Sequence, residues 1–499
     1  MTIPEYIVVQ AGGKGTRLKR HTVNKPKAIV SVENLPMIFH LFKKYPDSKY
    51  VIIGDHLKEV LDRYLDTFCD ARYVTVGTDG CKGTCSGISN ALELIPPGKK
   101  IMLIWSDLVL NEKFKLPDTD EDQVGISGTF ECRWSYRKES FDEEPSEKDG
   151  VAGLFVFSDK TKLEGVPREG EFVRWLQSKN ALFERIELNG SSEYGLEEKI
   201  KTPEAGKCRP FNSMRNENEV VIKEGIDEQG RKLAVRETAW YRHVANYDVA
   251  IPKIYGFDPL TMECIDGKNV SAYNFTHDER KVILVHIMDS LNSLHVHDCS
   301  PTDPFSMYEA YYKKTVDRLN KVRNLIPFAN DPILTINGKR CRNVFFHLDE
   351  LRERSKHISC KHFCLIHGDC TFSNIMLRNG KEPVFIDPRG YFGFSELSGD
   401  PNYDWAKLYY SVVGDYDKFN LGKFNLKIDE KEISISTETN GWRDVENVFI
   451  ENLPEEISIE DIRLIHAIIW LSLTTYAWND YDSVCGAFYY GTYYLEDVL

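Results

Sequence analysis

Short apolar runs alternate with amphipathic segments along the first two hundred residues. The runs predict strands at Tyr6–Val9, Tyr50–Ile53, Tyr73–Val76 and Lys100–Trp105. Between them, apolar residues at helical spacing predict helices at Met37–Lys43, Leu57–Phe68 and Cys85–Leu94. This alternation predicts an α/β domain with a mostly parallel, doubly wound sheet that is covered on both faces. Such sheets bind ligands at the carboxyl ends of their strands.

The pattern changes around Thr202–Cys208, where proline, glycine and charged residues predict a domain boundary. A short β-like stretch and a helix at Leu233–His243 follow, and a mostly helical pattern then fills Glu279–Lys356. A strand–loop–strand unit is predicted at Phe363–Ile386. We therefore expect a second, bilobal α+β domain and divide the chain into residues 1–205, a small lobe with hinge at 206–270, and a large lobe at 271–499.

Three glycines follow the first predicted strand. Gly12, Gly13 and Gly15 would let backbone N–H groups turn toward an anion without side chains in the way. Arg17 and Lys27 come next and can neutralise the charge of a triphosphate. The loop is no Walker motif, because no Gly-Lys-Ser/Thr ends it.

This string resembles the nucleotidyltransferase family that makes nucleoside-diphosphate sugars and CDP-alcohols. The positions that match the family pattern are Gly12, Gly13, Gly15, Thr16, Arg17, Leu18, Pro26 and Lys27. The resemblance implies that Arg17 and Lys27 are catalytic and that Gly12, Gly13, Gly15 and Thr16 bind the nucleotide. It covers residues 1–205, which we therefore expect to be a nucleotidyltransferase domain.

Other residues extend this resemblance. Asp107, at the end of a predicted strand, takes the place of a magnesium-binding aspartate, and Thr84 and Ser86 lie in a segment that resembles the one against the nucleoside. Lys179, after the strand-like sequence FVRWLQ, roughly matches the lysine that meets the acceptor phosphate. Two positions depart from the family: its Glu-Lys-Pro reads Gln-Ser-Lys-Asn around Lys179, and its second metal aspartate is Glu193 here.

A second set of chemical groups lies in LIHGDCTFSNIML and VFIDPRG. Asp369 can accept the proton of an attacking hydroxyl, while Asn374 and Asp387 supply oxygen ligands for magnesium. We expect the runs Phe363–Ile366 and Val384–Ile386 to pair as strands and so to bring Asn374 and Asp387 together.

This string resembles the aminoglycoside phosphotransferase and choline kinase superfamily, whose loop reads His-Gly-Asp, four residues, Asn. Gly368 and the sequence Asp387-Pro388-Arg389-Gly390 favour a small-molecule kinase over a protein kinase. GDPNYDWAKL also matches, and in it we expect Asp400 and Asp404 to anchor the large lobe. The resemblance implies a protein-kinase-like fold for the second domain.

The small lobe of such a kinase supplies a lysine to the nucleotide phosphates and a glutamate to hold it. Lys223 ends a β-like run and Glu237 lies on a predicted helix, so both fit these roles. Met262 and Glu263 resemble the hinge that meets the adenine. Arg209–Met214 is predicted to form the turn over the phosphates.

Composition limits the other partners. The chain of 499 residues has 63 basic and 77 acidic side chains, a net charge of −14, which argues against a nucleic-acid footprint. The twelve cysteines show no zinc spacing, and nothing resembles a leader before the first strand. Leu464–Trp478 is too short and polar to span a bilayer and predicts a buried helix. We expect a cytoplasmic protein without membrane insertion; no pattern indicates its oligomeric state.

Together these features predict a bifunctional enzyme with Mg²⁺ as cofactor. ATP would phosphorylate a small hydroxyl compound, and an NTP, CTP or UTP by preference, would then transfer NMP to that phosphate and release pyrophosphate. Fused proteins of this kind are associated with bacterial capsule and surface polysaccharide synthesis. The alternative is an active kinase whose first domain is a nucleotide-binding regulator; a scaffold without activity fits poorly, because the catalytic groups are all present.

The sequence does not decide whether the acceptor is a sugar, a polyol or an amino alcohol. A choline-type acceptor would need an aromatic cage. Candidates for the cage, or for ordinary large-lobe core, are Tyr391, Phe392, Phe394, Tyr403, Trp405 and the tyrosine-rich tail from Trp478 to Tyr494.

Overall fold

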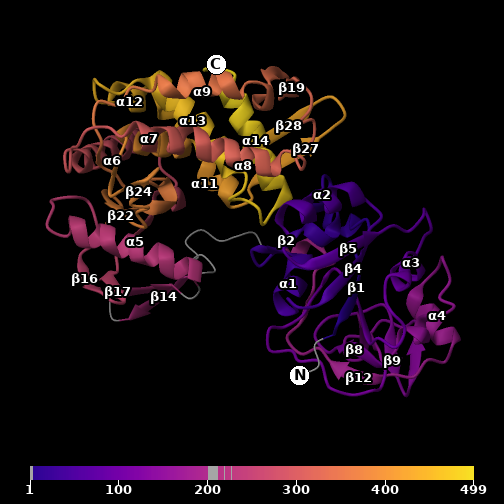
Figure 1. Cartoon of the computed structure of the whole chain (residues 1–499). Coiled ribbons are helices and arrows are strands. Elements are labelled where there is room, and N and C mark those ends of the chain that lie inside the picture. The colour runs from indigo at the N-terminus through magenta and orange to yellow at the C-terminus, as the bar shows by residue number, and fades with distance from the viewer. Residues whose placement is uncertain (1–3, 201–211, 218–219, 226–227) are drawn as a thin grey trace. The chain divides into compact units, whose positions relative to one another are not determined.

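The structure is a computed structural model of the chain and describes residues 4–200, 212–217, 220–225 and 228–499 (Figure 1). The chain forms two compact units: Met1–Lys201 with Trp478–Asp482, and Thr202–Ala477 with Ser483–Leu499. The predicted boundary after residue 205 lies outside the described residues.

Four parallel strands form the centre of the first unit. Their order in the sheet is β5 (Arg72–Val76), β4 (Lys49–Ile53), β1 (Tyr6–Gln10) and β6 (Ile101–Trp105). The chain builds outward from β1 through β4 to β5, then crosses back to place β6 on the other side of β1. The strand order therefore reverses between β1 and β6, which is where open α/β sheets bind their ligands.

Five further strands extend the sheet beyond β6. They are β11 (Gly150–Phe157), β8 (Gln123–Ser127), β12 (Glu184–Glu187), β9 (Ser135–Arg137) and β10 (Ser140–Asp142). Only β11 and β10 run against the other strands of this nine-stranded sheet. The prediction of a mostly parallel sheet is thus confirmed.

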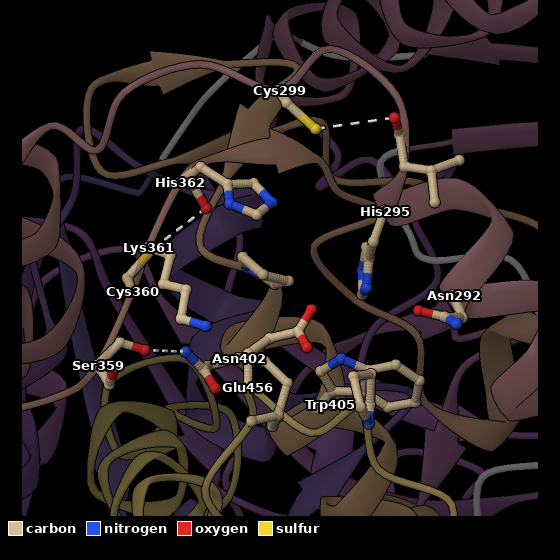
Figure 2. Close-up of a pocket in the computed structure, with 14 residues that line it drawn as sticks. Asn292, His295, Cys299, Ser359, Cys360, Lys361, His362, Asn402, Trp405 and Glu456 are labelled. Carbon is tan, nitrogen blue, oxygen red and sulfur yellow. Dashed lines mark hydrogen bonds between the residues drawn. The ribbon is translucent and has the colours of Figure 1, made fainter.

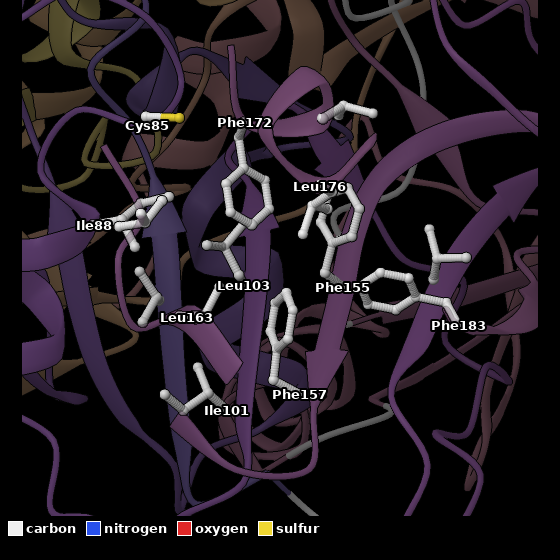
Figure 3. Packing of buried hydrophobic residues seen from close by; sticks show 14 of the residues in the cluster. Cys85, Ile88, Ile101, Leu103, Phe155, Phe157, Leu163, Phe172, Leu176 and Phe183 are labelled. Carbon is white, nitrogen blue, oxygen red and sulfur yellow. The ribbon is translucent and has the colours of Figure 1, made fainter. Parts of the chain in front are cut away.

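Helices cover both faces of this sheet because successive side chains of a strand point to opposite sides. The helices are α1 (Met37–Lys44), α2 (Lys58–Phe68), α3 (Ile88–Glu93) and α4 (Phe172–Ser178). On one face, Ile88 of α3 and Phe172 and Leu176 of α4 pack with Leu103 of β6 (Figure 3). On the other, Phe42 of α1 packs edge-on against the Tyr50 ring, 4.7 Å between centroids.

Two local expectations for this unit are wrong. FVRWLQ is part of helix α4 and not a strand, because Phe172, Val173 and Leu176 point at the core from one helical face. The helix predicted from Cys85 begins only at Ile88, after Gly87 in a left-handed conformation.

The small lobe of the second unit is an antiparallel sheet with one long helix. The strands are β14 (Asn212–Glu217), β15 (Val220–Gly225), β17 (Leu260–Glu263) and β16 (Ile254–Phe257), in that order. Helix α5 (Glu228–Val244) follows β15 along the chain. Of Arg209–Met214, the predicted phosphate turn, residues 209–211 lie outside the described residues.

The large lobe is mainly helical (Figure 1). Its longer helices are α6 (His277–His295), α8 (Lys314–Val322), α9 (Leu348–Lys356), α10 (Pro401–Val412), α13 (Ile459–Leu473) and α14 (Tyr481–Leu495). Strands β22 (Ile375–Arg378) and β23 (Glu382–Phe385) form a hairpin beside β18 (Gly267–Asn269). The bilobal α+β prediction is confirmed.

Two expectations for the large lobe need correction. The stretch predicted as helical is interrupted by a hairpin of β19 (Ile333–Ile336) and β20 (Lys339–Arg342). Strand β21 (Cys364–Leu365) pairs with β26 (Ser398–Gly399) and not with β23. Among the helices of the described ranges, none combines the length and apolar character that crossing a bilayer requires.

Gly153 offers a test of the sheet. It lies in β11 at φ +86°, where the register against β8 shifts, and a Cβ on it would run into the Trp105 ring. We expect Gly153→Ala to lower the free energy of unfolding of the first unit by about 3 kcal/mol, from left-handed strain and overpacking together. The measurement is urea unfolding followed by tryptophan fluorescence.

Gly165→Ala is the matched control. Gly165 has a similar φ of +79°, but no atom lies within 4 Å of the position of its Cβ. The control should cost only about 1 kcal/mol. Equal losses in the two variants would show that the Trp105 contact contributes nothing.

Candidate active sites

The first candidate site lies where the strand order of the first unit reverses. The glycine loop leaves β1 and Asp107 follows β6, and these two parallel strands are neighbours. A hydrogen bond of 3.1 Å from the Ser106 N–H to the Gln10 carbonyl ties their ends together. The fold therefore brings the predicted phosphate loop and the predicted metal ligand to one edge of the sheet.

Two glycines of the loop contribute to it in different ways. Gly15 has φ +61°, and a Cβ there would lie 2.9 Å from Thr22 Cγ2 and 3.2 Å from Lys27 Cβ, so its absence lets Lys27 approach the loop. Gly13 is exposed, and no atom lies within 4 Å of where its Cβ would be. The neighbouring Thr16 and Arg17 are exposed too, so the loop is open to a ligand.

Two carboxylates face this loop. Lys27 Nζ forms an ion pair with Asp107 Oδ2. Strand β13 (Ser192–Glu193) pairs with β7 (Leu108–Val109), and the Tyr194 N–H donates to the Asp107 carbonyl at 2.9 Å. The structure thus places Glu193 beside Asp107, although the two are far apart in sequence.

Two more cations complete the site. Lys199 Nζ lies 2.8 Å from Glu193 Oε2. A Cβ on Gly195 would clash with Glu193 Oε1 and lie 3.0 Å from Arg17 Nη2, so Arg17 reaches the same place. Sequence reasoning missed Lys199, because nothing in its surroundings distinguishes it from an ordinary surface lysine.

The donor set suits magnesium. Asp107 and Glu193 are mostly buried, with side-chain exposures of 15% and 19%, and Mg²⁺ prefers carboxylate oxygen. Among the described residues, no three His, Cys, Asp or Glu side chains cluster as a metal site. A magnesium ion at these two carboxylates would therefore take its remaining ligands from phosphate and water.

The segment that contains Thr84 and Ser86 lies beside the end of β1. Gln10 Nε2 donates to the Thr84 carbonyl at 2.7 Å, and the Phe172 N–H donates to Thr84 Oγ1 at 2.7 Å. Ser86 Oγ donates to the Gly83 carbonyl at 2.6 Å. Both hydroxyls hold the segment in place, so backbone groups are what it offers to a nucleoside.

Lys179 stands apart from these groups. It caps the C-terminal end of α4, whose N-terminal end contacts Thr84, so about 10 Å of helix separates the two. Its side chain is exposed and contacts none of the predicted site residues in the described part of the chain. The structure does not bring Lys179 together with Lys27 and Asp107.

The second candidate site is in the second unit and begins with Lys223. Its Nζ lies 2.8 Å from a Glu237 carboxylate oxygen and 2.7 Å from Asp387 Oδ1. Burial by itself lowers the pKa of Lys223, but the Asp387 and Glu237 carboxylates outweigh it and raise the pKa above its ordinary value. Lys223 is therefore a permanent cation held between the lobes, in place to meet phosphate oxygens.

Asp369, Asn374 and Asp387 meet at the base of the hairpin of β22 and β23. The Ile386 N–H donates to the Asn374 carbonyl at 2.9 Å, and Asn374 Nδ2 donates to Asp369 Oδ2 at 3.2 Å. The expected pairing of Phe363–Ile366 with Val384–Ile386 is wrong, but the hairpin brings the same residues together.

These groups also fit magnesium. Asn374 Nδ2 donates to the carbonyl and to the carboxylate of Asp369, so the amide oxygen of Asn374 is not the atom that contacts Asp369. Asp387 has φ +57°, a strained conformation of the kind found at functional sites, and its side chain is half-exposed. An amide oxygen and a carboxylate are ligands that a hard cation prefers.

The buried carboxylate of Asp404 holds the catalytic loop. It accepts hydrogen bonds of 2.7 Å from the N–H groups of His367 and Gly368, and one of 3.1 Å from His295 Nε2. His367 in turn donates from Nε2 to the Ile386 carbonyl at 2.9 Å. Burial lowers the pKa of His367, so its ring stays neutral and acts as a structural group.

Lys407 is a site residue that the sequence did not reveal. It lies on α10 one turn after Asp404 and forms an ion pair of 2.9 Å with Asp369 Oδ1. The spacing of three residues on one helix was the available signal. Lys407 holds the carboxylate of Asp369 in one orientation.

The predicted hinge residues lie at the end of β17. Met262 is buried within the small-lobe sheet, opposite Val221. Glu263 accepts a bidentate pair of hydrogen bonds from Arg378 Nη2, each 2.9 Å. Because this ion pair occupies the Glu263 side chain, only backbone groups are left there for an adenine.

A cavity of about 260 Å³ lies behind the catalytic loop (Figure 2). His295, Asn402 and Trp405 line it. His295 connects it to Asp404, but Asp369 is not among its lining residues. The cavity is therefore connected to the loop only through His295 and Asp404. The predicted phosphoryl transfer belongs to the site around Asp369 and not to this cavity.

Known proteins resemble different parts of this chain. Residues 227–422 match the model of the family described as "Phosphotransferase enzyme family". This match lies inside the region predicted for a kinase-like domain and confirms that prediction. A UTP–glucose-1-phosphate uridylyltransferase of Haloferax volcanii is 39% identical over 62 residues, 12% of this chain. The chain spans about a quarter, 26%, of that relative's length.

Solved structures similar to this chain include two cytidylyltransferases. The inositol-1-phosphate CTP transferase from T. maritima is 12% identical with a TM-score of 0.34, covering 40% of this chain and 93% of that one. The CTP:phosphocholine cytidylyltransferase from Streptococcus pneumoniae is 19% identical with a TM-score of 0.31, covering 39% and 94%.

Asp404→Asn tests how the catalytic loop is held. An asparagine side chain has one acceptor oxygen in place of two. Its NH₂ group would therefore face the N–H of either His367 or Gly368, and that hydrogen bond would be lost. We expect the free energy of unfolding of the second unit to fall by about 3 kcal/mol. Urea unfolding is the measurement, and Asp444→Asn, at an exposed position, is the control. An unchanged transition in Asp404→Asn would show that the loop is held by other contacts.

Proposed function

We propose that this chain is a bifunctional enzyme that phosphorylates a small hydroxyl compound and then joins a nucleotide to the new phosphate. The product would be an NDP-activated precursor for surface polysaccharide. The observation that carries the proposal is the assembly of Lys223, Glu237 and Asp387 beside Asp369 and Asn374. All of these except Lys223 lie in the region that matches the phosphotransferase family.

In the kinase step, the hydroxyl oxygen of the acceptor attacks the γ-phosphorus of ATP. The P–O bond to the β-phosphate breaks, ADP leaves, and Asp369 takes the hydroxyl proton. Lys407 holds Asp369 in line, and Lys223 neutralises phosphate oxygens. Asn374 and Asp387 would hold Mg²⁺, which when bound neutralises charge on the phosphates.

In the nucleotidyl step, an oxygen of the new phosphate attacks the α-phosphorus of a second NTP. The bond to the β-phosphate breaks and pyrophosphate leaves. Arg17 and Lys27 lie at the glycine loop and would stabilise the departing charge. Asp107 and Glu193 would hold Mg²⁺ for this step.

The order of the two steps follows from their chemistry. A kinase makes a phosphate ester, and a nucleotidyltransferase consumes one. CTP and UTP are the preferred second substrates, in a cytoplasmic enzyme that acts on small molecules.

A second candidate function keeps only the kinase active and makes the first unit a nucleotide-binding regulator. Two observations favour it. Lys179, the predicted acceptor lysine, stands apart on an exposed helix end, and Glu193 replaces the usual aspartate. A screen for pyrophosphate release, crossing four NTPs with phosphorylated sugars and alcohols, separates the two candidates.

Asp369→Asn should lower ATP-dependent phosphorylation of the free acceptor by about 10²–10⁴-fold, because the hydroxyl proton loses its acceptor. Nucleotidyl transfer to a supplied phosphate ester should continue at the wild-type rate. The measurement is transfer of label from [γ-³²P]ATP beside pyrophosphate release. Asp444→Asn serves as the control, and a fully active Asp369→Asn enzyme would remove Asp369 from the mechanism.

Asp107→Ala should have the opposite effect. Loss of a metal-binding carboxylate should lower pyrophosphate release by at least 100-fold, while ATP-dependent phosphorylation is retained. Asp118→Ala, at an exposed position of the same unit, is the matched control. Pyrophosphate release at the wild-type rate in Asp107→Ala would show that this carboxylate binds no catalytic metal.

A further inference from the structure

Four basic side chains of the large lobe surround the catalytic Asp369. This basic cluster consists of Lys314 and Arg318 on one face of α8, Arg389 in the loop after Asp387, and Lys407 on α10. Only Lys407 belongs to the kinase mechanism described above. The other three form no ion pair with Asp369 in the part of the chain that the structure describes.

Two tyrosine rings contact three members of the cluster. Lys314 Nζ and Lys407 Nζ lie 5.7 Å and 5.9 Å from the centroid of the Tyr403 ring. The Arg389 guanidinium lies 5.7 Å from the centroid of the Tyr391 ring. Since Lys407 contacts Asp369 directly, these contacts place Lys314 close to the hydroxyl that Asp369 would deprotonate.

The positive charge of the cluster is not compensated by the protein. In the described part of the chain, neither Lys314 nor Arg389 forms an ion pair or donates a side-chain hydrogen bond. Arg318 donates only to the carbonyl and hydroxyl of Ser472, at 2.6 Å and 3.0 Å. Of the four cations, Lys407 pairs with Asp369, Arg389 is attracted by the same carboxylate, and Lys314 is attracted by Glu309.

This arrangement is costly without a ligand. Lys314, Arg318 and Arg389 are half-buried, and burial together with Arg389, Arg318 and Lys407 lowers the pKa of Lys314 to about 7. Withdrawing like charges from water is unfavourable unless an opposite charge joins them. An anion bound at the cluster would supply that charge.

The ATP phosphates are not this anion. The lysine that meets them, Lys223, comes from the small lobe and is paired with Glu237. The basic cluster comes from the large lobe alone and lies on the Asp369 side of the site, where the acceptor hydroxyl must be. The acceptor is therefore the molecule that faces it.

The two tyrosine rings next to the basic cluster do not offer a cage for a quaternary ammonium. The Tyr391 ring has Arg236 at 4.8 Å and Arg389 at 5.7 Å, and the Tyr403 ring has two lysines within 6 Å. Phe392 and Trp405 were candidates either for the aromatic cage or for the core of the large lobe, and both are buried core residues. A cationic acceptor would meet repulsion here rather than a cation–π site.

We propose that the acceptor of the kinase site is an anionic hydroxyl compound, with a carboxylate or phosphate close to the hydroxyl that receives the γ-phosphoryl group. The proposal rests on the proposed kinase function and narrows its substrate class. It excludes choline and simple amino alcohols, and Lys314 and Arg389 bind the anionic group.

The test is calorimetric titration of the whole chain loaded with Mg²⁺ and AMP-PNP. The probes are inorganic phosphate, acetate and tetramethylammonium, and the phosphate and acetate arms distinguish the two kinds of anion. We expect at least one of the anions to bind saturably and tetramethylammonium not to bind. Lys314→Gln and Arg389→Gln should weaken anion binding at least tenfold, and Lys314→Arg should restore most of it.

Lys313→Gln is the matched control, because Lys313 is the exposed neighbour that pairs with Asp317. It should bind the anion as the wild type does. The proposal is overturned if neither anion binds, if tetramethylammonium binds instead, or if Lys314→Gln keeps wild-type affinity while thermal melting shows it folded.

The loading step separates this proposal from the kinase assignment. If AMP-PNP itself fails to bind in the presence of Mg²⁺, the proposed kinase function fails. If AMP-PNP binds and the anion results are negative, the kinase stands and only the anionic acceptor is wrong. Phosphorylation assays with glycerate, glycerol and choline as matched acceptors give the same comparison by turnover, with glycerate expected to be preferred at least tenfold.

Discussion

A charge that is withdrawn from water must find an opposite charge or a set of hydrogen bonds, and this requirement places most of the functional groups of the chain. The predicted catalytic and metal-binding side chains are held in this way. The pairs are Lys223 with Glu237 and Asp387, Asp369 with Lys407, Asp107 with Lys27, and Glu193 with Lys199. Asp404 meets the same requirement with three N–H donors. The pairs fix side-chain directions before any ligand arrives, so little reorganisation is needed when a substrate binds.

Topology then decides where these pairs can form. In the first unit, the return of the chain to place β6 beside β1 leaves a crevice at the strand ends, where the glycine loop and Asp107 meet. In the second unit, the tight hairpin of β22 and β23 joins Asn374 to Asp387. In both cases short local structure follows a strand end, which is why local sequence motifs could predict that these residues lie together.

The same distinction explains what the sequence could and could not predict. The glycine loop and the run from His367 to Asn374 are contiguous, and their roles could be read directly. FVRWLQ could not be assigned, because six residues with four apolar positions fit a strand or a helix, and only packing against the core decides for α4. The pairing of β21 with β26 depends on long-range packing, for which a single sequence carries no local signal. The spacing of Lys407 from Asp404 places it on the same helix, but its contact with Asp369 follows only from the fold.

The overall charge of the chain gives the basic cluster its significance. With a net charge of −14, the protein repels anions at a distance, so electrostatic steering does not favour an anionic acceptor. Affinity for such a molecule must then come from cations at short range, where a low local dielectric makes each of them effective. Lys314, Arg318 and Arg389 are the group in the large lobe that meets this condition beside a catalytic base. Their product would carry a further phosphate, and the first unit offers Arg17, Lys27 and Lys199 around two carboxylates to receive it. The kinase step would thus raise the negative charge of the intermediate, and in each unit local cations exceed the acids beside them.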